Sequence, residues 1–325
     1  MLGSRWGCMP LVAAAALVLT ALGWLGAGWV WSGPLTHDTE FVVPDGSSLS
    51  SIADKLEKDG VIGSAAAFKL RARVFGMGST IKAGEFKLPA HASMRAVLGI
   101  VASDEVLRRF VTIPEGMPSI MVYDRLMANP NLTGTIEVPT EGSVLPDTYE
   151  IEKGESRQAV VLRMQAAMQR TLAEQWAKRS PDTVAKTPEE ALVLASIVEK
   201  ETGKPSERPM VAGLYSNRIR TGMQLQADPT IIYPITKGRA LGRRIKQSEK
   251  DAVNDYNTYS MFGLPKGPIT NPGRLSIAAV LNPAKTGALY MVADGTGGHL
   301  FAATLAEHNA NVEKWFIIRK NRGDF

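Results

Sequence analysis

Residues Lys186–Arg208 read KTPEEALVLASIVEKETGKPSER, and the rest of the chain can be organised around the helix that this stretch predicts. Thr187 is a favoured N-cap, Pro188 fits a first helical turn, and Glu190 supplies the third-position acid of a capping box, so a helix is expected to begin here. Gly203 is expected to end it. The unusual feature is a carboxylate at a position where such a helix should carry an apolar residue.

That carboxylate belongs to Glu201. At about 100° per residue, Glu201 falls in the stripe formed by Leu194, Ile197 and Val198, whereas Glu199 points to almost the opposite side of the helix. Desolvation and the carbonyl-rich end of a helix both raise the pKa of a carboxyl group, so Glu201 is expected to hold a proton near neutral pH, as a general acid does. The alternative is a last turn that reaches the surface and leaves both glutamates solvated.

The chain of 325 residues is 45% hydrophobic, and we expect an α+β protein with two globular parts and an anchor. No charged residue occurs between Trp6 and Thr36. Within this run, residues 10–31 are long enough to cross the ~30 Å hydrocarbon core of a membrane as a helix, and residues 32–38 read as a linker.

The charges on either side of the apolar run predict its orientation. Arg5 precedes it, and Asp38 and Glu40 follow it. The positive-inside rule then leaves residues 1–9 in the cytoplasm and exports the rest, as in a single-pass inner-membrane protein with a periplasmic catalytic part. A cleaved signal peptide is the alternative, because the small residues 26–28 resemble a processing site.

Composition narrows the classes of partner. The net charge of +5 and the pI near 9.2 suit contact with acidic polymers without choosing among nucleic acid, lipid and glycan. The basic run 239–250 lacks interleaved aromatic residues and is typical of a solvated loop, so no nucleic-acid partner is expected. Cys8, the single cysteine, precedes the apolar run, and His299 and His308 lack a carboxylate at ligand spacing. Neither a metal site nor another cofactor is expected.

A strand-turn-helix pattern occurs three times after the linker. It begins at Phe41 (FVVPDGSSLSSIADKL), at Phe86 (FKLPAHASMRAVLGIV) and, more loosely, at Val111 (VTIPEGMPSIMVYDRL). The first copy resembles a LysM module, a small βααβ fold whose members usually hold N-acetylated glycans. Residues 39–108 are therefore expected to form a LysM-like domain that positions carbohydrate. The alternative is a plain α+β spacer between the membrane and residues 109–325.

Beyond a second helix expected over residues 207–220, polar and aromatic residues gather on loops rich in glycine and proline. Seven sequence blocks between residues 196 and 301, taken in their order, resemble the YceG-like family of endolytic murein transglycosylases. The blocks are Ser196–Thr202 (SIVEKET), Leu225–Thr230 (LQADPT), Tyr256–Tyr259 (YNTY), Gly263–Pro265 (GLP), Asn271–Gly273 (NPG), Asn282–Thr286 (NPAKT) and Gly298–Phe301 (GHLF).

The resemblance implies a fold, an activity and a site. Residues 109–325 would form a catalytic domain of the YceG-like type, in which Glu201 is the catalytic residue. The protein would cut peptidoglycan glycan strands and work beside peptidoglycan synthases. The remaining blocks would line the glycan cleft, with candidate substrate contacts at Gln226, Asp228, Tyr256, Asn257, Tyr259, His299 and Phe301.

Other interpretations stay open at this stage. Asp228 precedes a proline, and Asp-Pro often opens a turn or a helix, so it is either a structural residue or a substrate contact. A hydrolase on the same site would use Asp228 to activate water, whereas a lytic transglycosylase needs one acid-base residue only. A third reading is a catalytically silent wall-binding or assembly protein.

Overall fold

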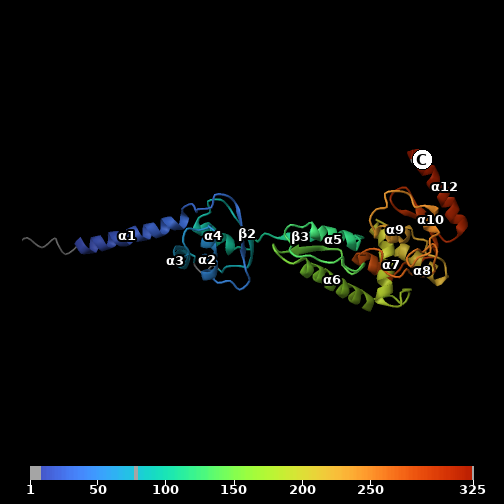
Figure 1. The fold of residues 1–325 in the computed structure, drawn as a ribbon, viewed down its shortest axis with the longest axis horizontal. Coiled ribbons are helices and arrows are strands. Elements are labelled where there is room, and N and C mark those ends of the chain that lie inside the picture. The colour runs from blue at the N-terminus through green and yellow to red at the C-terminus, as the bar shows by residue number, and fades with distance from the viewer. Residues whose placement is uncertain (1–8, 77–79, 324–325) are drawn as a thin grey trace, which may run out of the picture. The chain divides into compact units, whose positions relative to one another are not determined.

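The computed structural model describes residues 9–76 and 80–323, and the chain divides into two compact units, Met1–Arg108 and Arg109–Phe325 (Figure 1). Helices predominate in both units, and the described strands form three antiparallel pairs. The α+β class predicted from the sequence is confirmed. Each unit is described by itself below.

The first unit packs three helices against one strand pair. Strand β1 pairs antiparallel with β2, and this register places Phe41 opposite Phe86 in the core. Helices α2 and α3 separate the two strands along the chain, so the order is βααβ followed by a further helix. The elements are α1 (Met9–Val30), β1 (Thr39–Val43), α2 (Leu49–Lys58), α3 (Ala65–Phe75), β2 (Gly84–Leu88) and α4 (Met94–Val101).

Helix α1 is long and apolar enough over Val12–Val30 to cross a membrane, and its described side chains are mostly exposed. This is compatible with a single-pass anchor. Its C-terminal turns differ from the rest because they pack on the domain. Trp29 is buried against Phe68, with 6.4 Å between the ring centroids, and Arg71 Nε donates to the carbonyl of Leu25 at 3.2 Å.

All three predicted strand-turn-helix units are present, and their turns share one geometry. The third turn residue has a positive φ in each copy, at Gly46 (72°), His91 (58°) and Gly116 (71°). The next backbone N–H donates to the carbonyl of the proline that opens the turn, at 3.2, 3.2 and 3.3 Å. Glycine adopts a positive φ without strain, which explains its use in two of the three copies.

The second unit is built around helix α7, which packs against α6, α8, α9 and α11 (Figure 1). As predicted, Thr187 caps the helix, with its hydroxyl accepting from the backbone N–H of Glu190 at 3.2 Å. The elements are β3 (Arg109–Thr112), α5 (Ser119–Met127), β4 (Thr148–Ile151), α6 (Arg157–Ala177), α7 (Pro188–Glu201), a 3-10 turn (Pro205–Glu207), α8 (Arg208–Arg220), α9 (Asp228–Thr236), α10 (Gln247–Lys250), α11 (Arg274–Leu281), β5 (Tyr290–Ala293), β6 (His299–Ala302) and α12 (Leu305–Arg322).

Asn271 ties three distant segments of this unit together. Its Nδ2 donates to the carbonyl of Met117 at 2.9 Å and to the hydroxyl of Ser119 at 3.0 Å, and its Oδ1 accepts from the N–H of Val144 at 3.0 Å. Its backbone carbonyl accepts from the N–H of Gly116 at 3.0 Å. Since Asn271 is fully buried, removing the amide would leave several buried groups without partners.

We therefore expect Asn271→Ala to destabilise the second unit by about 2–5 kcal/mol, because each buried group left unpaired costs ~1–3 kcal/mol. Thermal melts of the full chain in detergent measure this loss. Asn282→Ala is the matched control, since Asn282 is exposed. Equal melting temperatures for the two variants would contradict the role given to Asn271.

Candidate active site

Glu201 is the last residue of α7, and its carboxyl group is held away from water. Oε1 is buried and has no hydrogen-bond partner, although other atoms of the residue are partly exposed. Burial, followed by the negative charge of Asp228, raises the pKa of Glu201 to about 7. A hydrogen bond from Tyr215 and the positive charge of Arg218 act in the opposite direction. The raised pKa expected from the sequence is present, with Asp228 as an added cause that the helical pattern did not suggest.

Tyr215 and Arg218 reach the site from α8, one helical turn apart. Tyr215 is buried, and burial together with the charge of Glu201 raises the pKa of its phenol well above the usual value. Arg218 donates to the carbonyls of Leu289 at 2.6 Å and Leu225 at 2.8 Å. Because three positions separate them, both residues lie on one side of α8, but the sequence analysis did not assign them to the site. The sequence signal that could have indicated them is their three-residue spacing on the helix that follows Glu201.

Asp228 and Tyr259 form the opposite part of the cluster. Asp228 is exposed at the first position of α9, where the helix dipole favours a negative charge. The hydroxyl of Tyr259 donates to Asp228 Oδ1 at 2.6 Å, and burial, followed by this hydrogen bond, raises the pKa of Tyr259. The structural interpretation of Asp228 holds because the residue opens α9, and its charge also acts electrostatically on Glu201. Its contact with a substrate stays a prediction.

The exposed Gln226 stands beside this pair in a left-handed backbone conformation, with φ of 50°. Its N–H donates to the carbonyl of Thr258 at 3.1 Å, and the hydroxyls of Thr230 and Thr258 are 2.8 Å apart. These buried threonine contacts join the LQADPT block to the YNTY block. A non-glycine residue with positive φ costs conformational energy, and such residues cluster at functional sites.

Glu199 is buried, which rules out the alternative of a last helical turn that leaves both glutamates solvated. Its side chain is 4% exposed, and Oε1 lies 3.0 Å from Arg208 Nη2 while Oε2 accepts from the N–H of Gly273 at 2.8 Å. Arg208 Nη2 also contacts Glu115 at 2.8 Å. Helix α7 is enclosed by neighbours on more than one side, so pointing away from Glu201 does not mean pointing into water.

Asn257 also needs correction as a substrate contact. The residue is fully buried, and its Nδ2 donates to the carbonyls of Lys250 at 2.9 Å and Ala252 at 2.6 Å. Its Oδ1 accepts from the N–H of Tyr259 at 3.0 Å. Since its amide is occupied by these loop contacts, Asn257 supports the loop that carries Tyr259 and is not available to a glycan.

The three other candidates take part in different contacts. His299 lies at the start of β6, where its Nδ1 is 2.9 Å from Glu207 Oε2, and its ring centroid is 6.3 Å from that of Phe301. Tyr256 packs on Tyr233 with 4.9 Å between ring centroids. Among the described interactions, Glu201, Asp228 and Tyr259 form one cluster. No described contact links Tyr256, His299 or Phe301 to this cluster.

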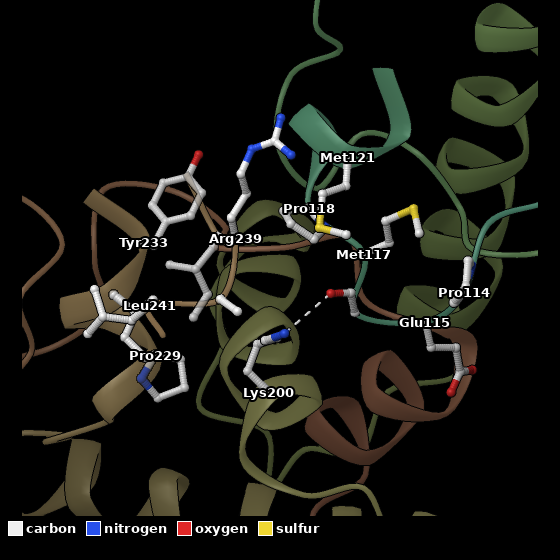
Figure 2. A pocket seen from close by; sticks show the side chains of 15 residues that line it. Pro114, Glu115, Met117, Pro118, Met121, Lys200, Pro229, Tyr233, Arg239 and Leu241 are labelled. Carbon is white, nitrogen blue, oxygen red and sulfur yellow. Dashed lines mark hydrogen bonds between the residues drawn. The ribbon is translucent and has the colours of Figure 1, made fainter. Parts of the chain in front are cut away.

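A pocket of about 450 Å³ borders the cluster without including Glu201 in its lining. Figure 2 shows Met117 and Pro118 lining it together with Tyr233, and Lys200 Nζ donates to the carbonyl of Gly116 at 3.5 Å. Lys200 precedes Glu201 in the chain, and Pro229, also in the lining, follows Asp228. The pocket and the carboxylate cluster therefore share the end of α7 and the start of α9.

The two glutamates at the end of α7 should respond to amide substitution in opposite ways. The pKa of Glu201 is raised in the folded state, so ionisation of this carboxyl lowers the free energy of unfolding. This loss of stability is absent below the unfolded pKa near 4.5 and grows as the pH rises through about 7. Glu201→Gln should therefore gain thermal stability over the parent chain at about pH 8 and gain little near pH 4.5.

Glu199→Gln should instead lose about 3 kcal/mol at neutral pH, since it removes one partner of a buried ion pair. Melting curves of both variants across this pH range make the comparison. A Glu201→Gln protein that is less stable than the parent at high pH would contradict the burial of an ionisable carboxyl.

The chain is similar to known proteins over most of its length. Residues 41–314 match the sequence profile of the YceG-like family. The chain is 28% identical to the endolytic murein transglycosylase of Bacillus subtilis, over 86% of this chain and 85% of that protein. It is 27% identical to the endolytic murein transglycosylase of Streptococcus pneumoniae, over 91% of this chain and 62% of that protein.

A crystal structure of a YceG-like protein from Listeria monocytogenes superposes with a TM-score of 0.53 at 26% identity, over 84% of this chain and 98% of that one. The region that matches the family profile, residues 41–314, includes the turn and helix of all three strand-turn-helix units and the cluster of Glu201, Asp228 and Tyr259. The chain belongs to the YceG-like family.

Proposed function

We propose that this protein is an endolytic murein transglycosylase, a lyase that cleaves the β-1,4 bond between MurNAc and GlcNAc within glycan strands. The observation that carries the proposal is the buried Glu201 carboxyl, whose pKa near 7 suits both donating and accepting a proton. The names of the Bacillus subtilis and Streptococcus pneumoniae relatives support the same substrate class.

In this mechanism Glu201 acts twice. The protonated carboxyl donates its proton to the glycosidic oxygen as the bond to MurNAc C1 breaks. The resulting carboxylate then removes the proton from the C6 hydroxyl of the same sugar, and O6 attacks C1 to form a 1,6-anhydro end. The nucleophile belongs to the substrate, which gives an entropic advantage of up to roughly 7–11 kcal/mol over a free molecule.

Asp228 and Tyr259 support these two steps electrostatically. The negative charge of Asp228 keeps the proton on Glu201 until the leaving oxygen takes it. Tyr259 donates to Asp228 at 2.6 Å and so fixes the orientation of that carboxylate. Because Asp228 is also exposed beside the acid, a hydrolytic reaction with Asp228 as the base for water is the second candidate function.

Product analysis separates the two reactions. Digestion of purified peptidoglycan should release fragments about 18 mass units, one water, lighter than hydrolytic ones, since no water is added. Glu201→Gln should lower turnover by ~10²-fold or more while the protein stays folded. Fragments of hydrolytic mass would assign the second function, and a fully active Glu201→Gln enzyme would remove Glu201 from the mechanism.

The pH dependence tests the role of Asp228. Activity should fall as the pH rises through about 7, because the reaction starts from protonated Glu201. Asp228→Asn removes a neighbouring negative charge, so the pKa of Glu201 decreases and the alkaline limb moves to lower pH. Asp255→Asn, at an exposed residue paired with Lys266, is the matched control. An unmoved limb in Asp228→Asn would contradict the electrostatic coupling.

For the first unit we propose membrane anchoring by α1 and glycan positioning by a LysM-like domain. The βααβ order supports the domain. Retention of the anchor is supported by the packing of Arg71 on Leu25 and Gly28, because cleavage near residues 26–28 would disrupt that packing. With nascent strands as substrate, the protein would end strand elongation beside peptidoglycan synthases.

The topology can be tested with a reporter. The single charge before the apolar run, Arg5, is basic and the first charges after it are acidic, so residues after the anchor should be periplasmic. A reporter fused after Phe325 that works only outside the cytoplasm should be active. Activity of a reporter that works only in the cytoplasm would reverse the orientation of both units.

A further inference from the structure

Helix α3 lies beside the last two turns of the apolar helix α1. Arg71 reaches furthest back along α1, where Nε bonds the carbonyl of Leu25 and the guanidinium lies 5.1 Å from the ring of Trp24. Phe75 packs on Trp29 at 6.0 Å. A side chain at Gly28 would collide with the guanidinium, so this glycine permits the close approach.

The length of the apolar span gives this contact its meaning. Val12–Val30 contains 19 residues, and at 1.5 Å per residue the span is about 28 Å long. That length barely matches the ~30 Å hydrocarbon core. The whole of α1, Met9–Val30, has 22 residues and is about 33 Å long, so less than one turn of ~5.4 Å is left over to hold the domain away from the bilayer. The part of α3 level with Trp24 and Trp29 therefore lies at the outer interface, which is the bilayer surface on the side of the domain.

The exposed side of α3 has the composition that this location requires. Leu70 and Val74 are each 51% exposed and lie one turn apart, next to the exposed cation Arg73. Two exposed tryptophans, Trp24 on α1 (65% exposed) and Trp31 directly after α1 (67% exposed), add aromatic side chains near this level. Two features are typical of proteins at membrane interfaces. One is tryptophan at the level of the lipid headgroups, and the other is a cationic side chain next to apolar ones.

We propose that α3 is a second membrane-binding element, which lies in the outer interface with Leu70 and Val74 in the lipid and Arg73 at anionic headgroups. The inference rests on the proposed anchoring by α1. A lipid surface is favoured over a protein partner because the exposed apolar residues continue directly from the helix that enters the membrane. The consequence is that the first unit is held against the bilayer at two points.

Lipid-attached quenchers test this location in the full-length chain. Cys8 is replaced by serine, and single cysteines at Leu70, Val74 or Glu57 are labelled with an environment-sensitive fluorophore in lipid discs of phosphatidylethanolamine and phosphatidylglycerol. Glu57 is the control because it is exposed on α2, outside the proposed surface. Labels at Leu70 and Val74 should be blue-shifted and quenched several-fold more strongly by the lipid quencher than the label at Glu57.

Two outcomes would overturn the proposal. Equal lipid quenching at all three positions would leave α3 in water. Protection of Leu70 and Val74 from a soluble quencher without lipid quenching would assign the surface to a protein, either a partner or a second copy.

The charge component is tested separately, since Arg73→Ala should weaken lipid quenching at Val74 in anionic discs and not in phosphatidylcholine discs. An equal effect in both lipids would exclude headgroup recognition by Arg73. Because no readout uses glycan cleavage, failure of the proposed enzymatic function would leave these results unaffected, whereas a chain that does not enter the discs would overturn the anchor itself.

Discussion

The buried ion pair between Glu199 and Arg208 is the interaction on which the position of the candidate active site depends. Arg208 begins α8, and Glu199 lies in the last turn of α7, so the pair fixes the junction between the two helices that carry Glu201 and Tyr215. Breaking such a pair costs about 3–5 kcal/mol, because the remaining charge stays buried. The same carboxylate also holds the N–H of Gly273, which connects α11 to this junction.

The features that local chemistry determines could be predicted from the sequence. The start of α7 was predicted because Thr187 and its partner are three residues apart, and the turn at Gly46 was predicted for the same reason. The raised pKa of Glu201 also follows from a local apolar stripe. Contacts between distant segments could not be predicted in this way. The bond from Gly273 to Glu199 spans 74 residues, and nothing in the helical pattern indicates it.

The motif blocks illustrate the same limit from the functional side. Blocks rich in polar residues suggested substrate contacts, yet Asn257 and Asn271 are buried and bind the backbone of their own unit. An amide side chain can satisfy several buried backbone groups at once, so a polar motif can be as necessary for holding loops together as for touching a ligand. Only the burial and the partners of each side chain distinguish the two roles.

The last turn of α7 places three consecutive residues in three environments. Glu199 forms the buried ion pair, Lys200 borders the pocket, and Glu201 holds a buried carboxyl whose pKa is raised to about 7. Successive helical residues are about 100° apart, so inserting or deleting one residue in this turn would rotate all three side chains away from their surroundings together. The spacing of this tripeptide is therefore constrained more tightly than the chemistry of any one member, and variation in this region should consist of substitutions and not of changes in length.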